Sequence, residues 1–263
     1  MDYSKWNVFF SGLGKGKTTL LKERLKECAI NGKTILFISS RISFANFLES
    51  QFANLGVLNY VNFKGDKSKY ETAKRLIVSM ESLHNVTRTY DYVIIDECES
   101  ALNVFSSSTL AQISNVKNML YWLLENCKTT YFCDAFVSNR TLDFIRDIKS
   151  STDKCFVLHN TEPTVKKKFI EIPVDDMTNA IIAKLNAGKK VFVCGTKKSY
   201  IDALEVPCKE KGIEGLFYSK DSSAEMNDTL KNVNEVWNKV KIVAYSPKIT
   251  VGVSYDLDDF DFC

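Results

Sequence analysis

Apolar and polar positions follow two different rhythms along the first half of the chain. Short runs that are rich in β-branched and aromatic residues are separated by longer amphipathic stretches. The short runs predict strands at residues 7–11, 34–38, 76–80, 92–96 and 130–133, and the longer stretches predict helices at 17–30, 43–54, 110–127 and 139–148. Because the strands are apolar on both faces, we expect an α/β fold with a parallel sheet flanked by helices.

The alternation of apolar runs and amphipathic stretches is interrupted between residues 155 and 174. A polar stretch there is followed by three lysines at 166–168, which we interpret as a solvated linker. The alternation then begins again. Strands are predicted at 169–172, 190–194, 216–218 and 241–245, and helices at 176–186, 200–211 and 230–239. We therefore predict two lobes, residues 1–160 and 161–263. Because residues 259–263 resemble the middle of an element, the second lobe is expected to be incomplete.

Composition narrows the class of protein. With 45% hydrophobic and 25% charged residues, the 263-residue chain fits a folded soluble protein, and no run approaches the roughly 18 to 20 apolar residues of a membrane span. The start lacks a secretory signal, so we expect an intracellular protein that is not secreted and has no membrane partner. The eight cysteines form no C-x-x-C pair, which argues against zinc, and those in apolar runs, such as Cys133 and Cys194, are expected to be buried thiols. A net charge of +3 permits a nucleic-acid partner without requiring one.

The strongest local signal is a glycine-rich stretch between the first predicted strand and the first predicted helix. It contains Ser11, Gly12, Gly14, Lys15, Gly16, Lys17, Thr18 and Thr19, all of which we predict to bind the phosphates of a nucleotide. Glycines let successive N–H groups point at phosphate oxygens, Lys17 would bridge the β- and γ-phosphates, and Thr18 would ligate Mg²⁺. Ser11 replaces the usual first glycine. A plain helix-capping turn would explain the glycines but not the Lys-Thr pair.

Two carboxylates, Asp96 and Glu97, end the apolar run at 92–96. Beside a bound nucleotide, Asp96 would bind Mg²⁺ through water, and Glu97 would orient and deprotonate the attacking water. An acidic pair at a strand end is also found as a solvated turn. Together with the phosphate loop, the pair favours a motor ATPase with Lys17, Asp96 and Glu97 as catalytic residues, because a small-molecule kinase does not need the adjacent glutamate.

Several further motifs follow in order. They are Ser-Ser-Arg-Ile-Ser-Phe-Ala at 39–45, Glu-Ser-Leu-His at 81–84, the stretch 90–100 with its Asp-Glu-Cys-Glu, Asp-Ala-Phe at 134–136, and the stretches 193–198 and 245–254. This series resembles superfamily 2 helicases, and more specifically the herpesvirus-type replication origin-binding protein family of large DNA viruses. The resemblance implies two RecA-like lobes, with ATP and Mg²⁺ on the first lobe and single-stranded or origin DNA across both. It also implies other replication proteins as partners, in the host nucleus or at a cytoplasmic viral replication site.

The motifs also carry expectations for single residues. Contacts to the nucleic-acid strand are expected from Ser40, Arg41, Ser82, His84, Thr196, Lys197 and Thr250. Asp134 and Gly252 are expected to couple the nucleotide state to movement of the lobes. Other interpretations stay open, because Arg41 would also fit an ordinary solvated turn and His84 a packed turn residue.

One departure from the family bears on activity. The arginines that in this family reach the γ-phosphate follow the motif at 245–254, and the chain ends at Cys263 before them. An arginine of this kind contributes about 10³- to 10⁵-fold in rate, so slow hydrolysis is expected of the chain alone. Our first hypothesis is an ATP-dependent DNA helicase core. The alternatives are a nucleotide-gated nucleic-acid binding module without turnover and a P-loop nucleotide kinase.

Overall fold

A computed structural model describes residues 4–12, 14–106, 112–162, 168–246, 253, 255, 257 and 259–263. The chain forms two compact units, Met1–Val165 and Lys166–Cys263, and each is described here by itself. The division lies close to the boundary at residues 160 and 161 that the sequence predicts.

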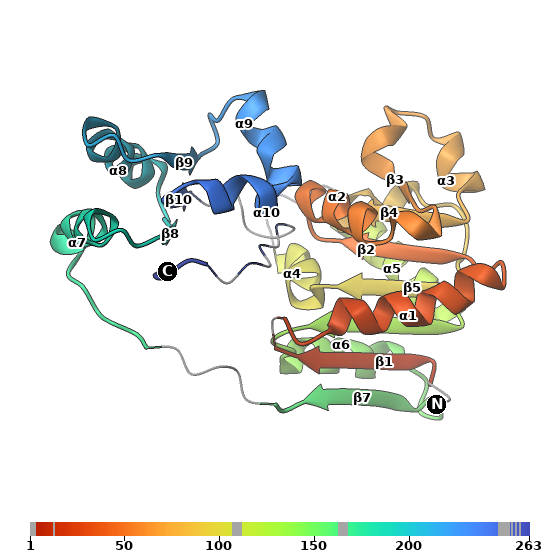
Figure 1. Ribbon diagram of the computed structural model, residues 1–263. Coiled ribbons are helices and arrows are strands. Elements are labelled where there is room, and N and C mark those ends of the chain that lie inside the picture. Colours follow the sequence, from red (N-terminus) through yellow and green to blue (C-terminus); the bar gives the residue numbers. More distant parts are fainter. Residues whose placement is uncertain are drawn as a thin grey trace. The chain divides into compact units, whose positions relative to one another are not determined.

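Unit 1 is built on a seven-stranded sheet (Figure 1). Its strands are β1 (Trp6–Ser11), β2 (Ile35–Ser39), β3 (Leu58–Asn59), β4 (Arg75–Ser79), β5 (Tyr92–Asp96), β6 (Thr129–Asp134) and β7 (Cys155–Asn160). They lie in the order β3-β4-β2-β5-β6-β1-β7, and every neighbouring pair is parallel. The parallel α/β arrangement predicted from the sequence is therefore confirmed.

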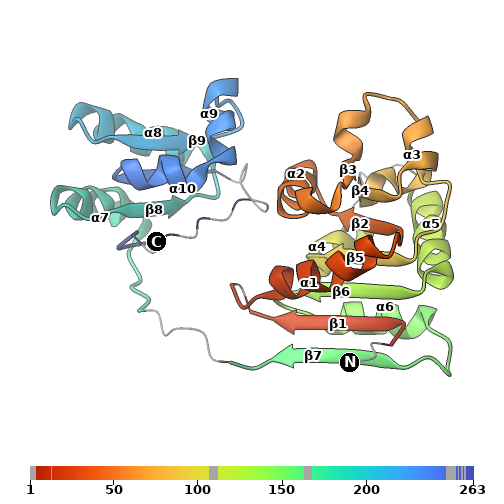
Figure 2. The ribbon, with the colours of Figure 1, turned by 45° about the vertical axis from the view of Figure 1, so that its right-hand side comes forward.

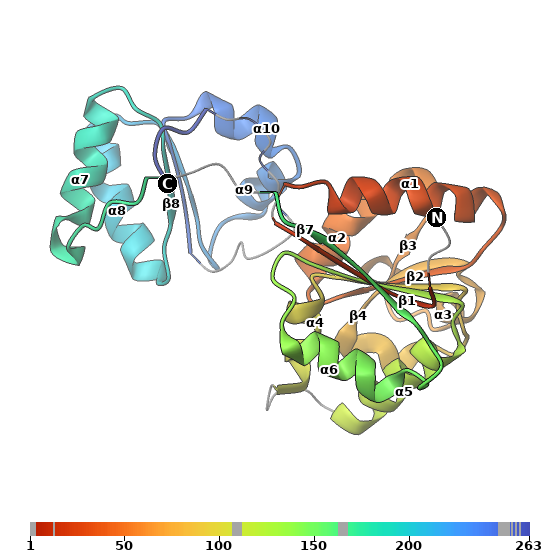
Figure 3. The same cartoon turned by 90° about the horizontal axis from the view of Figure 1, so that it is seen from below.

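Helices cover both faces of this sheet. They are α1 (Lys17–Ile30), α2 (Ile42–Gln51), α3 (Ser68–Thr72), α4 (Cys98–Asn103), α5 (Ile113–Asn126) and α6 (Asn139–Ile148), with short 3-10 segments η1 (Ala53–Leu55), η2 (Tyr60–Phe63), η3 (Met80–Asn85) and η4 (Val104–Ser106). Figure 3 shows α1 on one face and α5 and α6 on the other. Under α5 and α6, Ile95 and Phe132 of the sheet pack with Leu120 and Ile145, all at most 2% exposed. This burial holds the sheet's strand ends in place, because packed apolar area is the main stabilising term in such a layer.

Asp91, directly before β5, joins three segments of unit 1. Its carboxylate accepts hydrogen bonds from the backbone N–H (2.9 Å) and the hydroxyl (3.0 Å) of Thr34 and lies 2.6 Å from Lys128 Nζ. Burial alone would raise the pKa of this carboxyl, but the hydrogen bonds from Lys128 and Thr34 outweigh it and lower the pKa to about 2. Asp91 thus stabilises the folded chain in its ionised form.

We expect Asp91→Asn to lower the free energy of unfolding by about 1–3 kcal/mol at neutral pH. Because the pKa is lowered on folding, this contribution is fully present above the unfolded value of about 3.9 and is lost as the pH falls toward about 2. Urea denaturation at pH 7 and at pH values below 4 measures the difference, which should shrink on acidification. Asp147→Asn, at an exposed position of α6, is the control. A difference independent of pH would contradict the assignment.

Unit 2 contains a three-stranded parallel sheet in the order β8-β10-β9, with β8 (Val191–Cys194), β9 (Gly215–Tyr218) and β10 (Ile242–Tyr245). Its helical segments are α7 (Val174–Asn186), α8 (Lys198–Glu210), α9 (Ala224–Asp228), η5 (Thr229–Lys231), α10 (Val233–Val236) and η6 (Trp237–Lys239). Alternate residues of β10 face opposite ways: Ile242 packs with α7 and α8, and Val243 packs with Trp237. Figure 3 shows α7 and α8 on one side of this sheet and α10 on the other.

Three expectations for unit 2 are wrong. Residues 168–173 form no strand, and Phe169 is 92% exposed, so no sheet neighbour buries this run. The single helix predicted at 230–239 is divided into η5, α10 and η6, and Asn232, which leaves the helical conformation at φ −129° and ψ 47°, separates η5 from α10. Cys194 is exposed rather than buried, since it ends β8 at the sheet edge. Among the described helices, none has the length and hydropathy that a membrane span requires.

Candidate functional site

The site lies where parallel strands end. β5, β6 and β1 are neighbours in the sheet, so their carboxyl ends place Asp96, Asp134 and Ser11 along one edge. In open parallel sheets, ligands bind outside this edge. The topology therefore brings the phosphate loop and the acidic pair together, although about 80 residues separate them in sequence.

The glycine-rich loop connects β1 to α1. Gly14 and Gly16 have φ values of 69° and 84°, the left-handed region that favours glycine, and Gly16 caps the N-terminus of α1. The first turn of α1, with Thr18 half-buried and Thr19 exposed, carries backbone N–H groups that have no partner inside the helix. Such a loop and helix end form an anion-binding arrangement. Leu13 lies outside the described residues.

Two lysines of the loop lie in different surroundings. Lys17 Nζ donates to the carbonyl oxygens of Ser11 (2.5 Å) and Gly12 (3.2 Å), so its charge sits over the loop itself. Lys15 Nζ lies 3.6 Å from the carboxylate of Glu162, just beyond β7. The hydroxyl of Ser11 is buried and makes no hydrogen bond with the described residues. The ammonium group of Lys17 and the unpaired hydroxyl of Ser11 thus both lie at the loop where phosphate is expected.

Carboxylates gather beside Lys17. Asp96 is 5% exposed, and burial together with the Glu97 charge raises its pKa to about 7, against the opposing effect of Lys17. Burial and the charge of Asp134 also raise the pKa of Glu97, and Lys17 again opposes the rise. Glu97 itself has a left-handed backbone at φ 54°, which is uncommon for a residue other than glycine. These features are typical of a site arranged to receive positive charge.

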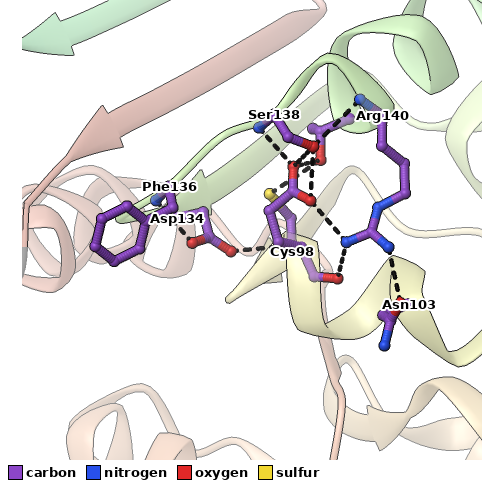
Figure 4. A network of polar contacts seen from close by, with 8 residues as sticks. Cys98, Asn103, Asp134, Phe136, Ser138 and Arg140 are labelled. Atoms are coloured by element: carbon purple, nitrogen blue, oxygen red, sulfur yellow. Dashed lines mark hydrogen bonds and ion pairs between the residues drawn. The ribbon is translucent and has the colours of Figure 1, made fainter.

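Asp134 at the end of β6 fixes the start of α4. Its carboxylate accepts hydrogen bonds from the backbone N–H groups of Glu99 (2.8 Å) and Phe136 (3.0 Å) (Figure 4). The strand end that carries Asp134 is thereby connected to the helix that begins directly after Glu97.

Glu99 is the centre of a second set of contacts that the sequence analysis missed. Its carboxylate accepts hydrogen bonds from Ser138 N–H (2.7 Å), Thr141 Oγ1 (2.6 Å) and Arg140 Nη2 (2.7 Å), and Arg140 also donates to Asn103 Oδ1 (2.8 Å) (Figure 4). Burial would raise the pKa of Glu99, but the hydrogen bonds from Thr141, Ser138 and Arg140 lower it. A serine directly before the helix predicted at 139–148 was the available sequence signal, since serine is a preferred N-cap.

Arg140→Met is expected to lower the free energy of unfolding by about 1–2 kcal/mol, because it leaves Glu99 without its charged partner. Arg146→Met on the same helix is a matched control: the pair of Arg146 with Asp143 is mostly exposed, and its removal should change stability by less than about 0.5 kcal/mol. Urea denaturation of both variants measures the difference. Equal effects would show that the Glu99 contacts add nothing beyond a surface pair.

The residues expected to contact nucleic acid in unit 1 also lie at the carboxyl edge. Ser40 and Arg41 follow β2, and Ser82 and His84 lie in η3 after β4, the strand beside β2. Arg41 and His84 are exposed. The hydroxyl of Ser40 is covered and has no hydrogen-bond partner among the described residues, while Ser82 Oγ accepts a hydrogen bond from Ser79 Oγ at 3.0 Å. The structure thus brings the two loops side by side.

In unit 2, Thr196 and Lys197 follow β8 and are exposed. Thr250 and Gly252 lie outside the described residues. Lys220 is exposed two residues beyond β9, at the same edge as Thr196. The neighbouring Lys198 is engaged with Asp202 and Asp221, at 2.9 and 3.0 Å.

Known proteins resemble the chain in sequence. The family model described as origin of replication binding protein matches residues 7–165. The chain is 31% identical to the "Putative replication origin-binding protein" of Acanthamoeba polyphaga mimivirus, covering 95% of this chain and 32% of the relative. It is 26% identical to the replication origin-binding protein of Varicella-zoster virus (strain Dumas), covering 94% of this chain and 33% of the relative. The chain therefore spans about a third of the length of these relatives.

Solved structures agree in fold. Mss116p bound to single-stranded RNA and AMP-PNP matches with a TM-score of 0.67 at 13% identity, over 97% of this chain and 59% of that one. Dbp5 of S. cerevisiae bound to RNA and ADP BeF3 matches with a TM-score of 0.65 at 12% identity, over 92% and 66%. The expected RecA-like, helicase-type fold is confirmed. Since the family model covers more than half of the residues, the chain belongs to the origin of replication binding protein family of large DNA viruses.

Proposed function

We propose that this chain is the ATP-driven motor part of a replication origin-binding protein and that it couples ATP hydrolysis to movement along single-stranded DNA. The observation that carries the proposal is the convergence of Lys17, Asp96 and Glu97 at one sheet edge, beside a loop whose N–H groups suit phosphate. Helicases of the same fold have been solved with AMP-PNP and with ADP BeF3, which supports nucleotide binding at this edge.

ATP binding would rearrange the phosphate loop. The backbone N–H groups between Gly14 and Thr18 would hold the phosphate oxygens, with further contacts from Ser11, Gly12, Lys15 and Thr19. Lys17 would exchange the carbonyls of Ser11 and Gly12 for the β- and γ-phosphates. The orphaned Ser11 hydroxyl is available to the same phosphates. Each exchange replaces a neutral acceptor by an anion, which strengthens the hydrogen bond.

The donor set fits Mg²⁺. Thr18 and Asp96 would supply oxygen ligands, and the raised pKa of the buried Asp96 reflects burial and the charge of Glu97, which Lys17 offsets only in part. The described residues contain no cluster of three or more acidic, cysteine or histidine side chains able to hold a metal. Phosphate oxygens and waters would therefore complete the coordination, as is usual for Mg²⁺. When bound, the ion neutralises phosphate charge.

A motor of this kind needs a general base for hydrolysis and a coupling between the nucleotide site and the nucleic-acid strand. Glu97 would orient the attacking water and accept its proton, and Asp134, which holds the N-terminus of α4, would transmit the change at the γ-phosphate, with Gly252 as its counterpart in unit 2. Strand contacts are assigned to Ser40, Arg41, Ser82, His84, Thr196, Lys197 and Thr250, with Lys220 added. The protein would act with other replication proteins where viral DNA is copied, in the host nucleus or cytoplasm.

Phosphate release from ATP, measured with and without single-stranded DNA, tests the proposal. We expect release to rise with DNA and to require Mg²⁺. If the chain bound ATP but released no phosphate in the presence of any oligonucleotide, the proposal would be contradicted and a nucleotide-gated binding module would be favoured. Phosphoryl transfer to an added nucleoside would favour a kinase instead.

A further inference from the structure

A groove on unit 1 lies apart from the phosphate loop, between α5 (yellow-green in Figure 2) and η3. It is a shallow depression of about 400 Å³, open to solvent, and is lined by His84, Gln112, Asn115, Asn118, Met119 and Trp122. We call it the α5 groove. Its α5 residues recur at spacings of three and four, so they form one stripe along the helix beside the buried face that carries Val116 and Leu120.

The lining combines one flat aromatic surface with neutral polar groups. Trp122 is 38% exposed, whereas Trp6 and Trp237 are each 1% exposed. Side-chain amides of Gln112, Asn115 and Asn118 offer both donors and acceptors. None of the six residues carries a permanent charge, which argues against a site for phosphate or for a metal ion.

Two contacts order this lining before any ligand arrives. His84 Nδ1 donates to the carbonyl of Glu81 at 2.9 Å, and the amide of Asn115 donates to Gln112 Oε1 at 3.3 Å. Gln112 caps α5 in a left-handed conformation at φ 59°, an uncommon backbone for a residue of this type. Such strain is found preferentially at functional positions.

A neutral, planar ligand with hydrogen-bonding edges fits these features, and an unpaired nucleobase has this chemistry. The volume accommodates one base and its sugar, since ligand sites start at roughly 300 Å³. The groove is continuous with η3, where Ser82 and His84 are assigned to the nucleic-acid strand. A strand passing η3 would therefore bring a base to the groove.

We propose that the α5 groove binds one unpaired base of the nucleic-acid strand, stacked on Trp122 and contacted at its edges by the amides of Asn115 and Asn118. This inference rests on the proposed function, because it requires that a strand passes over η3. Stacking accepts every base, so the groove would add affinity without reading sequence.

Tryptophan fluorescence tests the stacking. Because Trp122 is much more exposed than the other two tryptophans, a base stacked on it should quench its emission selectively. Oligothymidylate is titrated into the full chain and compared with an abasic oligonucleotide of the same length. We expect quenching by the first alone, and we expect Trp122→Phe to abolish the signal while keeping most of the affinity.

Affinity is measured separately by the anisotropy of labelled oligonucleotides. Trp122→Ala should weaken binding of oligothymidylate roughly 5- to 150-fold and leave binding of the abasic strand unchanged. Asn118→Ala, at an exposed position that folding tolerates, should weaken it less. Ile30→Ala, which removes a 75% exposed side chain from α1, is the control and should have no effect.

Two results would overturn the inference in different ways. If Trp122→Ala bound oligothymidylate normally and the parent chain showed no quenching, the α5 groove would not bind a base, and the proposed function would be unaffected. If the parent chain bound no oligonucleotide, both the base-binding role of the groove and the proposed function would be contradicted.

Discussion

Replacing Lys17 by alanine is expected to lower the rate of ATP hydrolysis at least about 100-fold and to weaken nucleotide binding. The ammonium group that now donates hydrogen bonds to the carbonyls of Ser11 and Gly12 is the positive charge that opposes the rise in the pKa values of both Asp96 and Glu97. A methyl group can neither bridge two phosphates nor balance Asp96 and Glu97. Phosphate release at saturating ATP and calorimetric binding of ADP measure the two effects.

Lys26→Ala is the matched control for this change. Lys26 lies on the same helix but is exposed, so its removal alters net charge by the same amount without reaching the loop. Far-UV circular dichroism establishes that both variants fold. Equal activity of the two variants would show that Lys17 does not contact the phosphates.

Glu97→Gln is expected to reduce hydrolysis about 100- to 10,000-fold while ATP binds as well as before or more tightly. The amide keeps the size of the side chain but cannot accept a proton from water. It also removes one negative charge near the phosphates and lowers the pKa of Asp96, which the Glu97 charge helps to raise. Single-turnover phosphate release, together with ATP affinity, separates the loss of chemistry from a loss of binding.

Glu23→Gln, an exposed glutamate of α1, makes the same chemical change outside the site and should be silent. If Glu97→Gln retained turnover while Asp134→Asn lost it, the base would have to be reassigned to Asp134. Loss of ATP binding in Glu97→Gln would instead indicate a structural role for this residue.

Much of the fold follows from local pattern. Runs such as 92–96 are apolar on both faces because they lie inside a parallel sheet. A short stretch of sequence is enough to recognise such a run. The two-residue strand β3 has no such signal, since its pairing with β4 is fixed by the neighbouring strand. Residues 169–172 carry the strand pattern but have no partner strand, and periodicity alone does not reveal that lack.

The candidate site also has parts that local sequence predicts and parts that it does not. Ser11 to Thr19 are near neighbours in sequence, from the end of β1 to the first turn of α1, so spacing and residue type were enough to predict a glycine-rich connection between a strand and a helix. The contacts of Glu99 with Arg140 join residues 41 apart, and the groove under Trp122 pairs α5 with η3. Such features depend on which elements pack together, which follows from the tertiary fold and not from local sequence.

The left-handed backbone of Glu97 places an uncommon, strained conformation on the residue that we propose as the general base. A glycine there would relieve about 1 kcal/mol or more of backbone strain and would also remove a carboxylate from between Asp96 and Asp134. Selection for thermal stability alone would therefore favour glycine or asparagine at position 97. We expect such proteins to be more stable and to lack hydrolytic activity. If Glu97 has the proposed role in turnover, relatives that hydrolyse ATP should keep a glutamate at this position despite the strain, and their sequences can be inspected for it before an assay is run.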